Sequence, residues 1–191
     1  INADFCSIAK RDSISEHLYK SIYIVDDFEN RTYDFLKQQN VRILGLPCLL
    51  YIIDHSILLH TFTFNNVYSL TLFKAIIVFS GFEHERKAEL SRLTKLAHFM
   101  GARVKLEVNR SVTHLIACDV KSSFYQDAVG LGMDVLNLDW LNYCWSHRQI
   151  TKFDGTHREI TANFRIKAFT GLCLAFHGFS PSALKEMIEI A

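Results

Sequence analysis

Apolar and polar positions alternate along the middle of the chain in a way that predicts strands separated by helices. Three short apolar runs lie at residues 76–80, 112–117 and 134–138, and each has the length and β-branched character of a buried strand. Segments with helical spacing lie between them. This alternation favours an α/β fold with a small parallel sheet, whose functional residues are expected at the ends of strands.

Residues 85–100 carry the clearest helical pattern. Charged residues occupy most faces of this segment. Four apolar side chains recur on one face at the spacing i, i+3, i+4 and i+7: Leu93, Leu96, Ala97 and Met100. Gly101 is expected to end this helix. A second helix is predicted over 139–148, with Asp139 accepting hydrogen bonds from its first-turn amides. Its two tryptophans, Trp140 and Trp145, are predicted to lie in the core.

These landmarks together resemble a BRCT repeat over residues 76–149. The first strand is followed by Ser-Gly-Phe, the long helix ends in Met-Gly-Ala, the next strand reads Val-Thr-His-Leu-Ile, and the last helix opens with Asp-Trp-Leu. The resemblance implies a parallel four-stranded sheet with helices on both faces. It also implies a domain that recognises protein partners, many of them phosphorylated.

Residues 1–60 repeat the second half of this pattern. A shift of 92 positions, which moves Ser21 onto Thr113, aligns the apolar runs of the two segments without a gap over about thirty residues. The first segment is therefore interpreted as a degenerate BRCT repeat with an opening strand at 5–9. Because no Ser-Gly or Thr-Gly step follows that strand, this repeat is expected to be structural and to lack a phosphate pocket.

Two connectors flank the central repeat. Residues 61–75 alternate aromatic and polar positions, which predicts an extended segment laid along both repeats or an edge strand. Residues 150–171 are mostly polar and are interpreted as a solvated linker, with a basic lip beside a ligand groove as the alternative. The strand pattern begins again at residue 172, and a helix is predicted from about Pro181. The segment 172–191 is interpreted as the incomplete start of a third BRCT repeat.

Composition narrows the classes of function. The 191 residues are 49% apolar, enough for one or two packed domains, and the formal net charge of +1 argues against a nucleic-acid partner. The five cysteines include no Cys-x-x-Cys pair and the nine histidines form no metal motif, so we expect an intracellular, reducing compartment and no metal site. The apolar run at 48–59 is interrupted by charge and too short to insert into a membrane. The sequence contains no catalytic motif, so neither catalysis nor a cofactor is expected of this chain.

Ser80 and Gly81 are the candidate phosphate-binding residues. They lie at the predicted carboxyl end of a parallel strand just before a helix, where first-turn amides point outward and attract anions. A hydroxyl, a glycine amide and a lysine would together bind the phosphate of a phosphopeptide. The alternative is that Ser80 only caps the turn into the helix.

The expected lysine is missing. Phosphate-binding BRCT repeats place it four residues before the position of Ala128, where this chain has Phe124. Three other bases lie in the turns nearby: Lys121, Lys105 and Arg110. Either Lys121 completes the usual pocket, or a different basic set binds the phosphate, with Arg165 and Lys167 of the linker as further candidates. The second alternative is favoured, because a shift of almost one helical turn changes the direction of the side chain.

Features outside the central repeat resemble a more specific family from about residue 20 onward. They include Val-Asp-Asp-Phe-Glu at 25–29, Leu-Gly-Leu-Pro at 44–47 and Asn-Phe-Arg-Ile-Lys at 163–167. The chain is similar there to the N-terminal regulatory region of the Pebble-type, or epithelial cell transforming, Rho guanine-nucleotide exchange factors of cytokinesis.

This second resemblance implies a non-catalytic regulatory module. Such a module restrains the exchange domain of its own protein and binds the phosphorylated Rho GTPase-activating subunit of centralspindlin. It implies a location in the cytoplasm and at the cell cortex, at the spindle midzone and cleavage furrow during division, with the nucleus as an interphase alternative. A BRCT adaptor of the DNA-damage response is the alternative function, and the missing phosphate lysine weighs against it.

Overall fold

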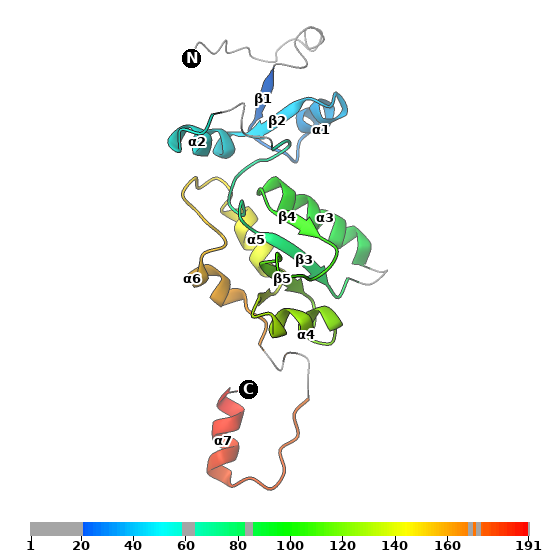
Figure 1. Ribbon diagram of the computed structural model, residues 1–191, viewed down its shortest axis with the longest axis vertical. Coiled ribbons are helices and arrows are strands. Elements are labelled where there is room, and N and C mark those ends of the chain that lie inside the picture. The colour runs from blue at the N-terminus through cyan, green and yellow to red at the C-terminus, as the bar shows by residue number, and fades with distance from the viewer. Residues whose placement is uncertain (1–20, 59–63, 83–85, 168–169, 171–172, 191) are drawn as a thin grey trace.

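The computed structural model describes residues 21–58, 64–82, 86–167, 170 and 173–190 (Figure 1). It contains a two-stranded sheet, a four-stranded sheet and a C-terminal helix that lies apart from both (Figure 1). Throughout these ranges the helices are too short or too polar to cross a membrane.

The first sheet belongs to the N-terminal segment. Its strands are β1 (Ile22–Val25) and β2 (Arg42–Gly45), which pair in parallel, and its helices are α1 (Arg31–Gln38) and α2 (Leu46–Asp54). Helix α1 begins where the side chain of Asn30 accepts a hydrogen bond from the Tyr33 amide at 2.9 Å. The predicted strand at 5–9 lies outside the described residues.

The second sheet confirms the predicted α/β class. Its strands run in parallel in the order β4-β3-β5-β6. The elements, in chain order, are β3 (Ile76–Ser80), α3 (Lys87–Phe99), β4 (Arg103–Lys105), β5 (His114–Ala117), α4 (Ser123–Gly130), β6 (Asp134–Leu136) and α5 (Asp139–Ser146). Each predicted strand of this repeat ends within two residues of its prediction, and β4 was not predicted from the residue pattern.

The internal repeat is visible in the element bounds. The shift of 92 positions moves the start of β1 at Ile22 onto the start of β5 at His114. The same shift moves the start of α1 onto that of α4, and the start of β2 onto that of β6. The first segment is therefore built from the same strand and helix order as the second half of the central repeat.

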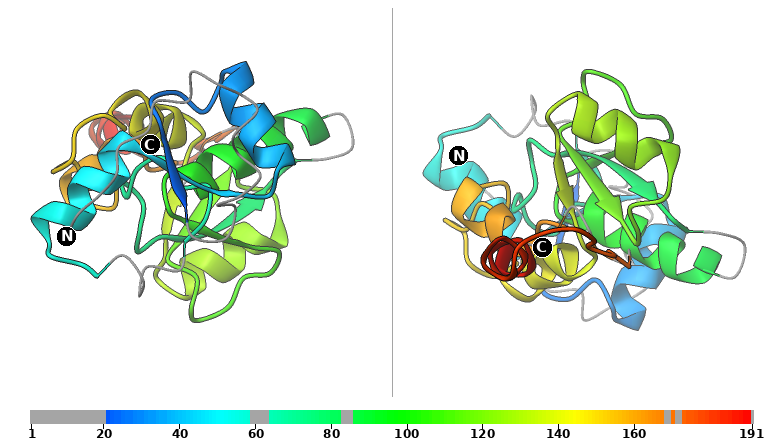
Figure 2. Two further views of the ribbon diagram at one scale, coloured as in Figure 1. Left: turned by 90° about the horizontal axis from the view of Figure 1, so that it is seen from above. Right: turned by 90° about the horizontal axis from the view of Figure 1, so that it is seen from below.

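Helices cover both faces of the four-stranded sheet (Figure 2). Helices α3 and α5 pack on one face, over a core that includes Ile77 of β3 and Ile116 of β5. Helix α4 packs on the other face, against Ile76 and Val78. Alternate residues of β3 thus enter opposite cores, as the two-residue period of a strand requires.

Trp140 lies in the core, as predicted, and Trp145 does not lie fully within it. Trp140 is 0% exposed, its ring stacks on His114 with centroids 4.9 Å apart, and its indole N–H donates to the Gly155 carbonyl at 2.9 Å. Trp145 is half-buried between the two repeats, beside Tyr68 and Phe99. Asp139 does not cap α5: the cap residue is Leu138, and the Asp139 amide instead donates to the side chain of Asn137.

Stability is expected to fall as the pH falls through the range where histidine titrates. Burial lowers the pKa of His114 from its ordinary 6.5, although Asp134 and Asp154 oppose the shift, and burial also lowers the pKa of His98. The two histidines therefore bind protons more readily in the unfolded chain than in the folded one. Their contribution to the free energy of unfolding is complete above pH 6.5 and is lost as the pH falls toward the lowered pKa values of the folded state. Urea unfolding at about pH 7.5 and 5.5 checks this, since His114→Gln should show a smaller decrease than wild type. Equal decreases in the two proteins would contradict it.

The connector forms hydrogen bonds with both repeats. Its residue Val67 makes a parallel bridge with Leu44, and its carbonyl accepts from the Gly45 amide at 2.9 Å. One residue later, the Tyr68 amide donates to the carbonyl of Phe99 at 2.7 Å. The connector therefore contacts both repeats, but its residues 71–74 form a turn and Val67 makes an isolated bridge rather than an edge strand.

The linker is solvated along much of its length but is also anchored to the second repeat at several points. Gly155 is buried, and its amide donates to the Thr71 carbonyl at 2.9 Å. Helix α6 (Arg158–Thr161) and the 3₁₀ helix η3 (Ala162–Phe164) follow, and Arg165 forms an antiparallel bridge with Leu136. The linker packs because the Trp140 indole needs an acceptor and because glycine lets the backbone approach the core.

The C-terminal segment contains the predicted helix but not the predicted strand. Helix α7 (Pro181–Ile190) begins at the predicted proline. The preceding residues 173–179 form no strand, and three of their apolar side chains are exposed: Leu174, Phe176 and Phe179. Within the described part of the chain no other strand pairs with this segment, so the third BRCT repeat stays a prediction.

Candidate functional site

Ser80 ends β3 and joins it to the start of α4. The residue is 5% exposed, and its hydroxyl hydrogen-bonds the hydroxyl of Ser122 at 2.5 Å. Ser122 is the cap of α4 and accepts from the Tyr125 amide at 3.2 Å. The cap residue of α3 is Arg86, and the turn that leads into this helix includes residues outside the described ranges, so the alternative that Ser80 caps that turn stays a prediction.

Gly81 brings the ends of β3 and β5 close together. Its φ is +81°, a conformation that favours glycine, and an added Cβ would lie 3.0 Å from the Cβ of Cys118 and 3.5 Å from Oδ2 of Asp119. The Cys118 amide also donates to the Ser80 carbonyl at 3.2 Å. The strand end therefore places a hydroxyl, a glycine turn and a carboxylate side by side.

Lys121 lies close to this strand end, but it contacts Asp119 through its backbone amide and not through its side chain. The Lys121 amide donates to Oδ1 of Asp119 at 2.9 Å, and its side chain is exposed. Phe124, at the position of the missing lysine, is partly buried and packs against the core beneath α4. The phenyl ring thus contributes to the core where a phosphate-binding repeat would present a cation.

Lys105 and Arg110 do not join Ser80. Lys105 is the last residue of β4 rather than part of a turn, it pairs in register with Val78, and its amine donates to the Ser111 hydroxyl at 2.6 Å. The chain then returns to the opposite end of β3, where the Thr113 amide donates to the Ile76 carbonyl at 2.9 Å. Arg110 precedes that contact by three residues, so it lies toward the amino ends of the strands.

The linker bases are also separate from Ser80. Arg165 forms an ion pair with Asp134, the first residue of β6, and bridges Leu136 at the outer edge of the sheet. Lys167 follows on the same edge and is exposed. Strand β5 stands between β6 and β3, so these side chains belong to another surface.

Arg86 is the cation that the sequence reasoning missed. Its guanidinium lies 5.2 Å from the ring centre of Phe82, and its Nε is 2.7 Å from Oε2 of Glu89. It also interacts with the thiol of Cys118, whose pKa is raised by burial and partly lowered again by Arg86. Phe82 and Cys118 both adjoin Gly81, so a partly exposed arginine stands at the strand end. Its position five residues after Gly81, at the start of a helix, was the available signal.

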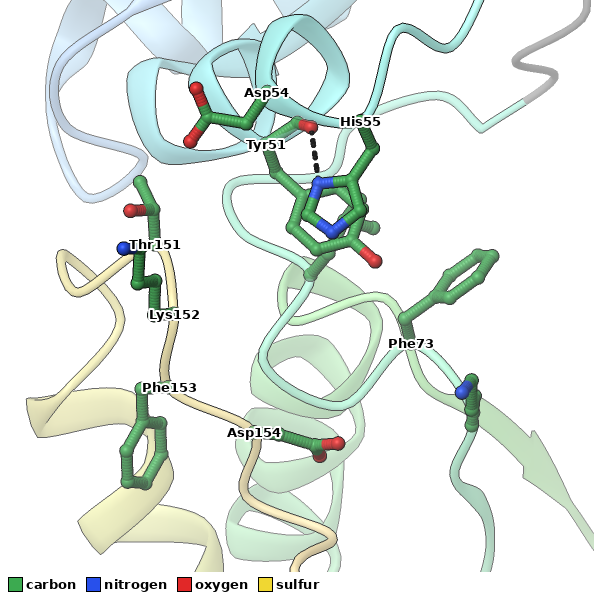
Figure 3. A pocket seen from close by; sticks show the side chains of 10 residues that line it. Tyr51, Asp54, His55, Phe73, Thr151, Lys152, Phe153 and Asp154 are labelled. Atoms are coloured by element: carbon green, nitrogen blue, oxygen red, sulfur yellow. Dashed lines mark hydrogen bonds between the residues drawn. The ribbon is translucent and has the colours of Figure 1, made fainter.

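A groove of about 640 Å³ lies between the end of α2, the connector and the linker (Figure 3). Tyr51 of α2 and His55, which caps the end of that helix, stack on one wall with ring centres 3.9 Å apart, and Asp154 projects from the linker. Lys74 also lines the groove and precedes β3, whereas Ser80 ends that strand. Two lysines and two aspartates line the groove: Lys74, Lys152, Asp54 and Asp154. Because their charges balance, they do not favour a phosphate.

Across the described ranges, no three histidine, cysteine, aspartate or glutamate side chains form a cluster able to hold a metal ion. The polar groups at the Ser80 strand end are two serine hydroxyls, the Arg86 guanidinium and the carboxylates of Asp119 and Glu89.

Solved structures similar to this chain include two complexes of the tandem BRCT repeats of Rad4. Rad4 BRCT1,2 with a Mdb1 phosphopeptide is 18% identical, with 77% of this chain and 78% of that chain covered and a TM-score of 0.42. Rad4 BRCT1,2 with a Crb2 phosphopeptide is 21% identical, with 70% and 74% covered and a TM-score of 0.39.

The chain also matches a protein-family model and two relatives in sequence. Residues 75–140 match the family model of the twin BRCT domain. Protein ECT2 of Mus musculus is 28% identical over 187 residues, and Protein ECT2 of Homo sapiens is 26% identical over 184 residues, each covering 96% of this chain. The chain spans 20% of the length of each of these relatives. The predicted resemblance is confirmed: residues 75–140 match the twin BRCT domain, and the chain is similar to ECT2 along nearly its whole length.

Proposed function

We propose that this chain is a phosphopeptide-binding regulatory module of a Rho guanine-nucleotide exchange factor. One observation carries the proposal: Ser80 and Gly81 end a central parallel strand beside the guanidinium of Arg86, in a chain similar to ECT2. The module itself has no exchange activity. It restrains the exchange domain of its own protein, and a phosphorylated partner relieves that restraint.

The proposed partner is the phosphorylated Rho GTPase-activating subunit of centralspindlin. Its binding would direct Rho activation to the cleavage furrow in cytokinesis, at the cell cortex above the spindle midzone. The similarity to ECT2 over 96% of the chain supports this partner over one of the DNA-damage response.

The strand end has groups that suit a phosphate. A phosphorylated side chain carries nearly two negative charges and three acceptor oxygens. The hydroxyls of Ser80 and Ser122 hydrogen-bond each other, so one of the two keeps an O–H that can donate to the phosphate. Arg86 offers a planar fork of N–H groups that can bind two oxygens together. Arg86 would thus supply the positive charge that phosphate-binding BRCT repeats obtain from a lysine at the position of Phe124. It does so from the α3 side of the strand end, whereas that lysine would lie on α4.

The decisive measurement is isothermal titration calorimetry of the chain with a phosphorylated peptide from the centralspindlin subunit. We expect a dissociation constant on the order of micromolar, and we expect dephosphorylation of the peptide to abolish binding. Ser80→Ala and Arg86→Gln should each weaken binding about tenfold, because each substitution removes a hydrogen-bond donor to the phosphate. Lys121→Glu should have a smaller effect, since its side chain points to solvent.

Two further variants sharpen this experiment. Arg103→Gln is the matched control, because Arg103 is an exposed base at the amino end of β4, where no effect is expected. Phe124→Lys restores the lysine of the resemblance and should strengthen binding of the phosphorylated peptide alone. Equal binding of both peptide forms would contradict the phosphate role. Normal binding of the phosphorylated peptide by Ser80→Ala and Arg86→Gln would show that the phosphate binds at another basic surface.

A further inference from the structure

An acid stands where the proposed phosphate would bind. Oδ2 of Asp119 lies 3.5 Å from the position that a Cβ on Gly81 would occupy, while Oδ1 accepts the Lys121 amide at 2.9 Å. Asp119 is half-buried, so its carboxylate is fixed by this contact and faces the turn at Gly81. A phosphate held at the strand end would therefore approach a fixed carboxylate.

Asp119 takes part in no ion pair among the described residues. Arg86 pairs with Glu89, and the other ion pair found among the described residues joins Arg165 to Asp134 at the edge of the sheet. Lys121 contacts Asp119 through its backbone, and its side chain is exposed. Two bases and two acids thus stand at this end of the sheet, and a phosphate would add negative charge that the protein alone does not balance.

We infer that the strand end selects phosphorylated segments that carry a lysine or arginine two positions away from the phosphorylated residue. This inference rests on the proposed function. The phosphate contacts Ser80 and Arg86, and the basic side chain of the ligand contacts Oδ2 of Asp119. In an extended peptide, residues two positions apart point to the same side at a separation of about 7 Å, which suits two neighbouring subsites of opposite charge.

Four pools of synthetic peptides provide the test. Each pool has a fixed central threonine, phosphorylated or not, and flanking positions that are either lysine and arginine or glutamine. Fluorescence anisotropy with the whole 191-residue chain measures their affinities. We expect the phosphorylated basic pool to bind about tenfold more tightly than the phosphorylated glutamine pool, because the basic residue balances a nearby carboxylate.

Asp119→Asn is the diagnostic variant. Asparagine keeps the acceptor for the Lys121 amide and removes the charge, so the preference for the basic pool should disappear, mainly through tighter binding of the phosphorylated glutamine pool. Asp127→Asn changes an exposed acid on α4 and should leave the preference intact. Thermal unfolding of both variants tests that the fold is retained.

The outcomes separate the inference from the proposed function. Equal affinity of wild type for the two phosphorylated pools, or a preference that persists in Asp119→Asn, overturns the selection by Asp119 and leaves phosphate binding in place. If unphosphorylated pools bind as tightly as phosphorylated ones, phosphate recognition itself is wrong, and the inference is overturned with it.

Discussion

Trp140→Ala is expected to lower the free energy of unfolding by about 3–5 kcal/mol. The side chain is 0% exposed, so its removal leaves a cavity between α5 and the sheet. The substitution also leaves the Gly155 carbonyl without its indole donor, which detaches the linker from the core. Urea denaturation followed by far-ultraviolet circular dichroism measures the change.

Trp145→Ala provides the comparison for this variant. Trp145 is half-buried between the repeats, so its truncation should destabilise the chain less than that of Trp140. An unchanged free energy of unfolding in Trp140→Ala, together with a loss of peptide binding, would show that Trp140 acts in recognition and would contradict its assignment to the core.

Gly45→Ala is expected to destabilise the junction of the two repeats by about 3 kcal/mol. The φ of Gly45 is ordinary, so the cost comes from space: an added Cβ would lie 2.3 Å from the carbonyl oxygen of Tyr68 and 2.7 Å from its Cα. These are backbone atoms, which cannot rotate away. The connector would have to leave β2, breaking the hydrogen bonds from the Gly45 and Cys48 amides to its carbonyls.

Gly130→Ala is the matched control for the junction. Gly130 ends α4, and an added Cβ would meet no atom within 4 Å. The substitution should be neutral or stabilise the chain by up to about 1 kcal/mol, because alanine favours helix more than glycine does. Urea unfolding of both variants checks the difference, and similar midpoints for the two would refute the close approach at Gly45.

The repeating apolar pattern predicted most of the fold because it reports burial. β3 and α3 were found since their side chains enter cores on a two-residue or helical period. β4 was missed because it is a short edge strand in which only Val104 is half-buried. The contacts of the linker with the core were missed for a similar reason, since its anchor is Gly155, a residue that carries no hydrophobic signal.

The candidate site was predicted only in part. Ser80 and Gly81 were placed correctly at a strand end, because that position follows from the order of strand and helix. Arg110 does not join the predicted site because the parallel topology carries the chain back to the other end of the sheet before β5 begins, and the Lys105 amine is bonded to Ser111 on that return. Arg86 and Asp119 became candidates only when the loops after β3 and β5 were seen together.

The linker, which is held at the edge of β6, also limits how far the C-terminal segment can move from the second repeat. The Ile166 amide donates to the Val135 carbonyl at 3.0 Å, which holds the chain at the edge of β6. Cys173 follows seven residues later, and an extended chain covers at most about 3.6 Å per residue, so it stays within roughly 25 Å of that edge. A partner that covers the exposed Phe176 and Phe179 would therefore be presented to the second repeat at a high effective concentration, and even a weak second contact would add avidity.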